Sequence, residues 1–185
     1  MTRQLGSTDL KRLHREWRRR TADADGSSAG GTMARLALLL DNVATPYNVG
    51  SILRTAAAMR VDHVWLAGAS ALPTHDRTRK TALGAERYLA WSHVELGATA
   101  VEEARAQGYL VVGIELADGA VPLPEAALGG DVCMAFGHED RGLSAACLDT
   151  CDQVAFVPQL GRIGSLNVAT AASIAIYEAR RRAWA

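Results

Sequence analysis

The fold of this chain is set out in residues 35–60, RLALLLDNVATPYNVGSILRTAAAMR. The stretch begins with RLALLLDN (35–42), a continuous apolar run typical of a strand that is buried on both faces of a sheet. It continues into NVGSILRTAAAMR (48–60), which predicts a helix whose start Asn48 can cap. A buried strand followed directly by a helix is the repeating unit of an α/β domain.

The same alternation continues toward the C-terminus. Further strands are predicted at HVWLAG (63–68), ERYLAW (86–91), YLVVGIEL (109–116), VCMAFG (132–137) and QVAFVP (153–158). Helices are predicted at 97–107, 144–150 and 167–182, and the stretch that ends near Leu83 reads as irregular or partly helical. We therefore expect an α/β fold with a mostly parallel sheet and helices on both faces.

The bulk composition is that of an ordinary globular protein. The chain has 185 residues, 49% of them hydrophobic and 22% charged, which suits one domain with a short appendage. No apolar run approaches the length of a membrane span, and no apolar region of a secretory signal follows the N-terminus, so we expect a cytoplasmic protein. Cys133, Cys147 and Cys151 are expected to be free thiols, because no nearby His or Cys completes a metal site.

The N-terminal 32 residues differ from the rest. We predict a basic arm and flexible linker at 1–32 and a single domain at 33–185. The net charge of the chain is zero, but DLKRLHREWRRR (9–20) is strongly basic. Its cations could neutralise RNA phosphates, with Trp17 stacking on a base, although a solvated helix end is an equally good interpretation. These predicted RNA-binding residues are Lys11, Arg12, Arg15, Arg18, Arg19 and Arg20.

Three polar, glycine-bearing segments follow predicted strands, where open parallel sheets bind ligands. The first places Asn48, Gly50 and Arg54 in an N-x-G-x-x-x-R arrangement. Gly50 and Arg54 are four residues apart on a helix, so a position without a side chain lies next to a permanent positive charge. Taken alone, the pattern fits better a helix that happens to carry a glycine and a surface arginine.

The other two segments are FGHEDRGLS (136–144) and VPQLGRIGSLNVATA (157–171). In FGHEDRGLS, a tight turn between strand and helix explains the glycines but not the acids Glu139 and Asp140. Ser144 can cap the helix that follows. In the second, capping of the last helix explains either Ser165 or Asn167 but not both. No G-x-G occurs in the chain, so a nucleotide-like ligand would have to be held without the usual fingerprint.

Together the three segments resemble the motifs of the SpoU (TrmH-like) branch of the SPOUT RNA methyltransferases, in the same order and spacing. The resemblance covers about residue 35 to 182. The residues that match the three motifs are Asn48, Gly50 and Arg54; Phe136, Gly137, Glu139, Gly142, Leu143 and Ser144; and Pro158, Ser165, Leu166 and Asn167.

The resemblance implies an S-adenosylmethionine-dependent methyltransferase that acts on an RNA ribose 2′-hydroxyl, with tRNA favoured over rRNA. It implies a C-terminal deep trefoil knot, and a homodimer whose active site is completed across the interface. It also implies that S-adenosylmethionine is held largely by backbone groups of the second and third motifs. The residues expected around the cofactor are Leu116, Gly137, Val157, Leu160 and Leu166.

By the same resemblance, Arg54 stabilises the charge that develops on the attacking ribose oxygen. Asn48, Glu139, Ser165 and Asn167 match the polar residues that hold Arg54 and the substrate. Whether Arg54 or an RNA phosphate takes the proton stays open, because a guanidinium hardly ever loses its own.

One position departs from the family pattern. His138 stands where many relatives have asparagine, and we expect retained activity with a greater sensitivity to pH. Two alternatives to the enzyme remain: a non-catalytic RNA-binding protein with a SPOUT fold, and an unrelated α/β enzyme that acts on a small metabolite.

Overall fold

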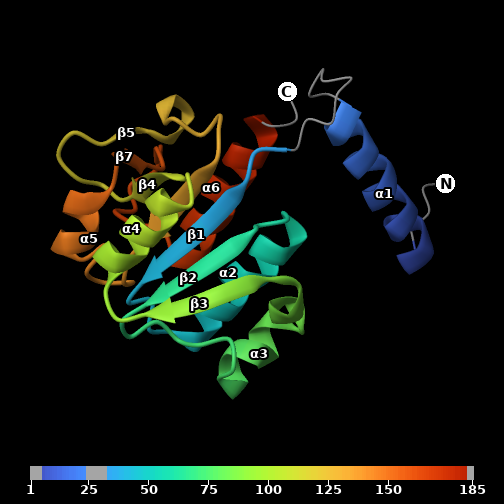
Figure 1. Cartoon of the computed structure of the whole chain (residues 1–185), viewed down its shortest axis with the longest axis horizontal. Helices are drawn as coiled ribbons and strands as arrows, with labels where there is room; N and C mark the ends of the chain where they lie inside the picture. Colours follow the sequence, from blue (N-terminus) through green and yellow to red (C-terminus); the bar gives the residue numbers. More distant parts are fainter. Residues whose placement is uncertain (1–5, 24–32, 183–185) are drawn as a thin grey trace.

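The computed structural model describes residues 6–23 and 33–182, and its main body is built around a seven-stranded parallel sheet (Figure 1). The strands lie in the order β3-β2-β1-β6-β4-β7-β5. Their bounds are β1 Leu36–Asp41, β2 His63–Ala67, β3 Ala90–Val94, β4 Leu110–Ile114, β5 Val121–Pro122, β6 Val132–Phe136 and β7 Gln153–Phe156. Every neighbouring pair is parallel, as the strand–helix alternation predicts.

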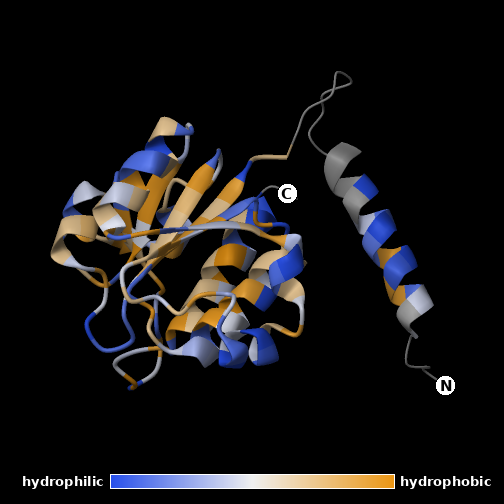
Figure 2. Ribbon diagram, turned by 60° about the horizontal axis from the view of Figure 1, so that its bottom comes forward, coloured by the Kyte–Doolittle hydropathy of each residue, from blue (hydrophilic) through white to orange (hydrophobic). Residues whose placement is uncertain are grey.

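Helices cover both faces of this sheet, which confirms the expected α/β architecture. Successive residues of β1 point to opposite faces of the sheet and belong to two hydrophobic clusters. Leu38 packs in one cluster with residues of α2 and α6, and Leu39 packs in the other with residues of α4 and α5. Figure 2 shows the apolar residues gathered along the strands. The helices are α2 Pro46–Ala58, α3 Asp76–Ala82, α4 Gly97–Ala106, α5 Ala145–Thr150 and α6 Val168–Arg182, with short 3-10 helices η1 Ala85–Tyr88 and η2 Leu123–Glu125.

A further helix, α1 Ser7–Asp23, belongs to neither layer (Figure 1). The linker predicted after it falls on residues 24–32, which lie outside the described residues. The division of the chain at residue 32 therefore stays a prediction. No helix in the two described ranges is long and apolar enough to cross a bilayer.

Three local predictions were wrong in instructive ways. Helix α2 begins at Pro46 with Thr45 at its N-cap position, because proline is already set for the first helical turn, so Asn48 does not cap it. The predicted strand 86–91 starts instead at Ala90, since the left-handed Leu83 and Gly84 lead into η1 first. The short strand β5 was missed, because two residues are too few to produce a pattern.

Arg180 fastens the C-terminal part of the last helix, α6, to the rest of the domain. This side chain is buried, and it donates hydrogen bonds to the carbonyl oxygens of Ala34 and Met59 at 2.8 Å and also to that of Arg60. The residue therefore ties α6 to the entry of β1 and the end of α2. Because its C-terminal part is held in this way, the position of the N-terminal end of α6, at Val168, is fixed as well.

Candidate functional site

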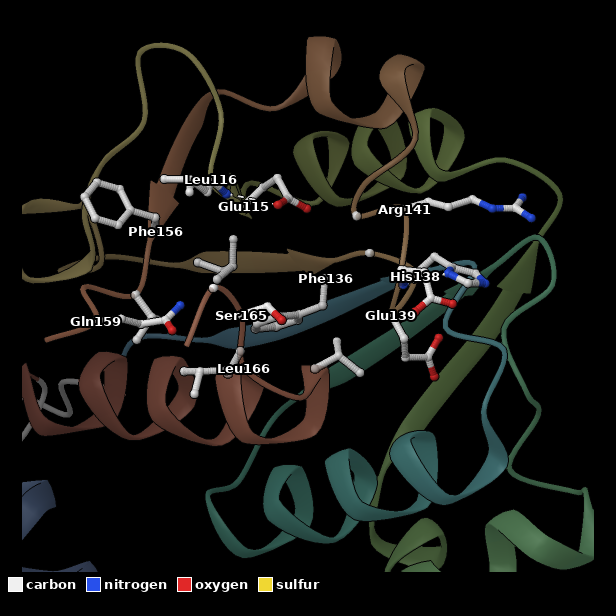
Figure 3. Close-up of a pocket in the computed structure, with 18 of the residues that line it drawn as sticks. Glu115, Leu116, Phe136, His138, Glu139, Arg141, Phe156, Gln159, Ser165 and Leu166 are labelled. Atoms are coloured by element: carbon white, nitrogen blue, oxygen red, sulfur yellow. Dashed lines mark hydrogen bonds between the residues drawn. The ribbon is translucent and has the colours of Figure 1, made fainter. Parts of the chain in front are cut away.

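A cavity of about 800 Å³ opens at the carboxyl ends of β4, β6 and β7 (Figure 3). Ile114, Phe136 and Phe156, the last residues of those strands, lie in its wall together with the loops that follow. This is the edge at which parallel α/β sheets bind ligands. The loop residues of the wall are Glu115, Leu116, Gly137, His138, Glu139, Asp140, Arg141, Gly142, Val157, Gln159, Gly161, Ile163, Gly164, Ser165 and Leu166.

The loop after β6 is a tight turn whose glycines are required by close packing. The backbone groups of His138 and Gly142 exchange two hydrogen bonds of 2.9 Å. A Cβ on Gly137 would overlap the backbone of Gly142, and Gly142 has a φ of +69° that suits glycine. The turn accounts for the glycines, as the simpler interpretation of the sequence proposed.

Glu115, which follows β4, holds this turn and was missed in the sequence. Its carboxylate accepts hydrogen bonds from the backbone N–H of Leu143 at 3.1 Å and of Leu116 at 3.0 Å. The available signal was an acid near the end of the otherwise apolar run 109–116, because the end of a buried parallel strand lies at the ligand-binding edge of the sheet.

The three polar segments are joined by side-chain hydrogen bonds. The amide nitrogen of Asn48 donates to Glu139 at 2.8 Å, and its amide oxygen accepts from Asn167 at 3.0 Å. Glu139 also accepts from the backbone N–H of Thr45 at 3.1 Å. The structure thus brings together one predicted residue from each motif.

Glu139 is held in its ionised form. Burial raises the pKa of its carboxyl group, but the hydrogen bonds from Thr45 and Asn48 outweigh this and leave the pKa below its usual range. A carboxylate with a lowered pKa is a weak base. Its place in the network therefore suits an anchor for polar groups better than a proton acceptor.

Asn167 has a second role at the start of α6. Its side-chain oxygen accepts from the backbone N–H of Ala169 at 2.9 Å, so it is the cap of this helix. Ser165 lies in the wall of the cavity, and its hydroxyl has no hydrogen-bond partner within the described ranges. Asn167 therefore does the capping, and Ser165 is left available to a ligand.

Arg54 does not join this network. It is exposed on α2, six residues beyond Asn48, which corresponds to about 9 Å along the helix and roughly 120° around it. It is not in the wall of the cavity, and it forms no hydrogen bond or ion pair with any described residue. The expected contact between Arg54 and the other motif residues is therefore absent within the described part of one chain.

Gly50 serves the packing of α3 on α2. A Cβ at this position would stand 2.6 Å from the carbonyl oxygen of Thr78 and 2.7 Å from the Cβ of Thr81. The close approach inferred from the sequence is real, but the group that approaches is a neighbouring helix.

The start of α5 is satisfied by Asp41, not by the Ser144 side chain as predicted. Ser144 makes no side-chain capping bond, whereas its backbone N–H donates to the buried Asp41 at 2.7 Å. Asp41 also accepts from Asn42 at 2.8 Å. The carboxylate thus links the end of β1 to the end of the second motif.

Of the residues expected around a cofactor, four lie together. Leu116, Gly137, Val157 and Leu166 are all in the wall of the cavity. Leu160 is fully exposed and lies outside the wall.

The predicted RNA-binding cations of the arm lie on α1. Lys11, Arg12, Arg15 and Arg19 are exposed, and Arg12 approaches Asp9 at 3.8 Å. The side chains of Arg18 and Arg20 lie outside the described residues. The role of the arm stays a prediction.

The cysteines are free thiols, with Cys133 and Cys147 buried. Burial raises the pKa of the Cys133 thiol well above its usual value. Among residues 6–23 and 33–182, no three His, Cys, Asp or Glu side chains are placed so that they could hold a metal ion.

Residues 35–177 match the model of the SpoU rRNA Methylase family. One curated relative is the 23S rRNA (guanosine-2′-O-)-methyltransferase RlmB of Acinetobacter baylyi, 36% identical over 151 residues, which are 80% of this chain and 60% of that protein. The chain spans 55–60% of the length of the first curated relatives that it matches.

Solved structures give the same fold. An AdoMet-bound rRNA methyltransferase from Sinorhizobium meliloti superposes with a TM-score of 0.75 at 29% identity, over 81% of this chain and 57% of that one. A structure that describes 2-OH methylation on tRNA gives a TM-score of 0.72 at 28% identity, over 82% of this chain and 97% of that one.

Proposed function

Because this chain belongs to the SpoU rRNA methylase family, we propose that it is an S-adenosylmethionine-dependent RNA methyltransferase that acts on a ribose 2′-hydroxyl. The observation that carries the proposal is the hydrogen-bonded set of Asn48, Glu139 and Asn167. Glu139 lies in the wall of the cavity, and Asn167 stands between the wall residues Leu166 and Val168. Polar groups from three distant segments thus converge on one binding site.

The cavity fits the proposed cofactor. Its volume of about 800 Å³ is in the range of sites for drug-sized ligands. Leu116, Val157 and Leu166 would contact the apolar parts of S-adenosylmethionine, and the backbone around Gly137 would contact its polar parts. No atom lies within 4 Å of the place where a Cβ of Gly164 would stand, so that loop has room for a ligand. When bound, the cofactor supplies an electrophilic methyl group.

The chain's own residues would then prepare the ribose oxygen. The Asn48–Glu139–Asn167 set orients the substrate at the edge of the cavity, with the Ser165 hydroxyl available as a further donor. The guanidinium of Arg54 stabilises the negative charge that develops as the hydroxyl attacks. The proton of the hydroxyl passes to an RNA phosphate while Arg54 stays charged, or to Arg54 if its guanidinium is neutral when the hydroxyl attacks.

The outward position of Arg54 supports a homodimer. Arg54 and Tyr47 lie seven residues apart on the exposed side of α2, and Ile174 and Tyr177 form an exposed apolar strip on α6. We propose an isologous dimer that covers these faces and in which Arg54 reaches the cavity of the partner subunit. We further propose the deep trefoil knot that the family resemblance implies. The crossover connections that place β6 between β1 and β4 are compatible with such a knot.

Two measurements test the proposed function. Calorimetry with S-adenosylhomocysteine should detect binding, and its absence would overturn the proposal. Radioactive methyl transfer from S-adenosylmethionine to bulk RNA should leave label in dinucleotides that resist alkali, as ribose methylation requires. The Arg54→Ala variant should lose this activity while it still binds S-adenosylhomocysteine.

The substrate class is proposed as tRNA, with rRNA as the second candidate. The observation that favours rRNA is the 36% identity between this chain and the 23S rRNA methyltransferase RlmB. Separation of the labelled RNA into tRNA and rRNA fractions decides between them.

A further inference from the structure

The segment from His75 to Tyr88 presents a second basic surface, on the main domain itself. Helix α3 and η1 carry four exposed cations against two acids, Asp76 and Glu86, and Tyr88 beside them is 83% exposed. Glu86 is half-buried, and one of its carboxylate oxygens is buried without a hydrogen-bond partner among the described residues. We name this the α3–η1 surface, and its members are Arg77, Arg79, Lys80, Arg87 and Tyr88.

Several cations elsewhere in the domain have acidic partners, whereas the four cations of the α3–η1 surface, like Arg54 and Arg60, have none among the described residues. Arg35 pairs with Asp131 at 2.8 Å, and Arg105 pairs with Asp152 at 2.8 Å. The arginines near the C-terminus are tied to Glu178 or to backbone carbonyls. Within the described ranges, none of the four cations of the α3–η1 surface forms an ion pair. The positive charge is therefore concentrated where the chain itself does not neutralise it.

The α3–η1 surface is also fixed next to the proposed active site. Helix α3 is seated on α2 at Gly50, where a Cβ would stand 2.6 Å from the carbonyl oxygen of Thr78. Gly50 lies two residues after Asn48, and Arg54 emerges one turn later on the same side of α2. The surface is thus carried by a helix that packs directly on the part of α2 between Asn48 and Arg54.

We propose that the α3–η1 surface binds the phosphate backbone of the RNA substrate beside the nucleotide that is methylated, and that Tyr88 stacks on an unpaired base. This rests on the proposed function and adds to it a contact site outside the cavity and outside the basic arm. Arginine forks match phosphate oxygens in geometry and charge. An exposed aromatic ring beside such cations is the usual platform for a splayed base.

The test measures binding of a fluorescein-labelled RNA stem-loop by anisotropy over a series of salt concentrations. The triple variant R77Q/R79Q/K80Q should bind at least about tenfold more weakly, and its plot of log affinity against log salt should flatten by about 2, because each lost phosphate contact removes roughly 0.7–0.9 from the slope. The matched control is Arg60→Gln, an exposed cation two residues beyond the C-terminal end of α2 whose side chain is likewise unpaired with any described acid. Its affinity and slope should stay at the wild-type values.

Tyr88 is tested separately. Tyr88→Ala should lower affinity about 5- to 100-fold, the usual effect of removing a stacking partner, without any change of salt slope. Tyr88→Phe keeps the ring and should restore binding. A merely structural role for Tyr88 would change the binding of S-adenosylhomocysteine as well.

The outcomes separate this inference from the proposed function. Undetectable RNA binding by the wild-type protein, or a triple variant with unchanged affinity and slope, would overturn RNA binding by the α3–η1 surface. Binding of S-adenosylhomocysteine would in that case still support the proposed methyltransferase function. If the wild-type protein fails to bind S-adenosylhomocysteine, the proposed methyltransferase function is overturned. A flattened slope in the triple variant would in that case still support RNA binding by the α3–η1 surface. If the triple variant is unfolded, Lys80→Gln alone should reduce the slope by about 0.7–0.9, and an unchanged slope would overturn the surface.

Discussion

Asn48 on α2 donates to Glu139 at 2.8 Å although 91 residues separate the two in the chain. The other end of the same amide accepts from Asn167, a further 28 residues beyond Glu139. Both polar atoms of Asn48 are therefore used in joining segments that are remote in sequence. One half-buried side chain determines how the first, second and third motifs meet.

Asn48→Ala should damage both stability and activity. It leaves the ionised Glu139 without its side-chain donor, which should cost about 1–3 kcal/mol of unfolding free energy. The displaced motif residues should lower methyl transfer on the order of 100-fold. Urea denaturation and single-turnover transfer measure the two effects. Ser51→Ala, half-buried on the same helix, is the control and should change neither by much.

Glu139 should make the fold sensitive to acid. Because its pKa is lower in the folded protein, it stabilises the fold above the pKa of the unfolded chain, about 4.3, and this stabilisation is lost as the pH falls through the lower folded value. Unfolding free energies of wild type and Glu139→Gln should therefore differ most near neutral pH and converge under acid conditions. A difference that grows on acidification would show that the hydrogen bonds do not hold the carboxylate ionised.

Arg54 should act on the partner subunit. Mixed dimers of Arg54→Ala and Asn167→Ala contain one intact site of the two if Arg54 crosses the interface, so they should regain about half of the wild-type activity. If Arg54 served its own subunit, both sites would be damaged and mixing would restore nothing. Methyl transfer by co-purified, differently tagged chains measures this, with each mutant homodimer as the baseline.

Gly50→Ala should destabilise the domain by about 1–3 kcal/mol, because the added methyl group meets the backbone of α3. Gly129→Ala is the matched control, since no atom lies within 4 Å of the place where its Cβ would stand. Thermal and urea denaturation of the two variants make the comparison. Equal stabilities would mean that α3 shifts freely on α2.

His138 should be replaceable by asparagine. Its Nδ1 accepts from the backbone N–H of Asp140 at 3.0 Å, and an asparagine side-chain oxygen can accept the same bond. Cofactor affinity of His138→Asn should therefore match that of the wild type, whereas His138→Ala loses the acceptor and should bind the cofactor more weakly. Calorimetry with S-adenosylhomocysteine measures the three affinities, and a His138→Asn variant as weak as His138→Ala would contradict this expectation.

The sequence predicted the sheet and most helices because long apolar runs and helical periodicity are local properties. The strand at Leu36–Asp41 and the helix at Val168–Arg182 needed no information from elsewhere in the chain. Asn48 shows the limit. Its residue type suits a helix cap, but Pro46 two positions earlier takes over the start of the helix and leaves the amide for two distant partners.

Parts of the site depended on partners that sequence patterns do not reveal. Asp41 ends β1 and Glu115 follows β4, and only the folded loops show that their carboxylates hold the second motif. The unpaired state of Arg77, Arg79 and Lys80 could not be read from their charges, since Arg35 and Arg105 have the same charge and are neutralised by Asp131 and Asp152.

The clamp formed by Arg180 has a consequence for synthesis of the protein. Helix α6 carries Asn167 at its start and Arg180 near its end, and it is held to the domain through carbonyl groups of residues made much earlier. A nascent chain has no complete motif set until α6 has left the ribosome and docked. Formation of the site is therefore coupled to the docking of α6, so a chain that stops before this helix should lack both the Arg180 clamp and the joined motifs.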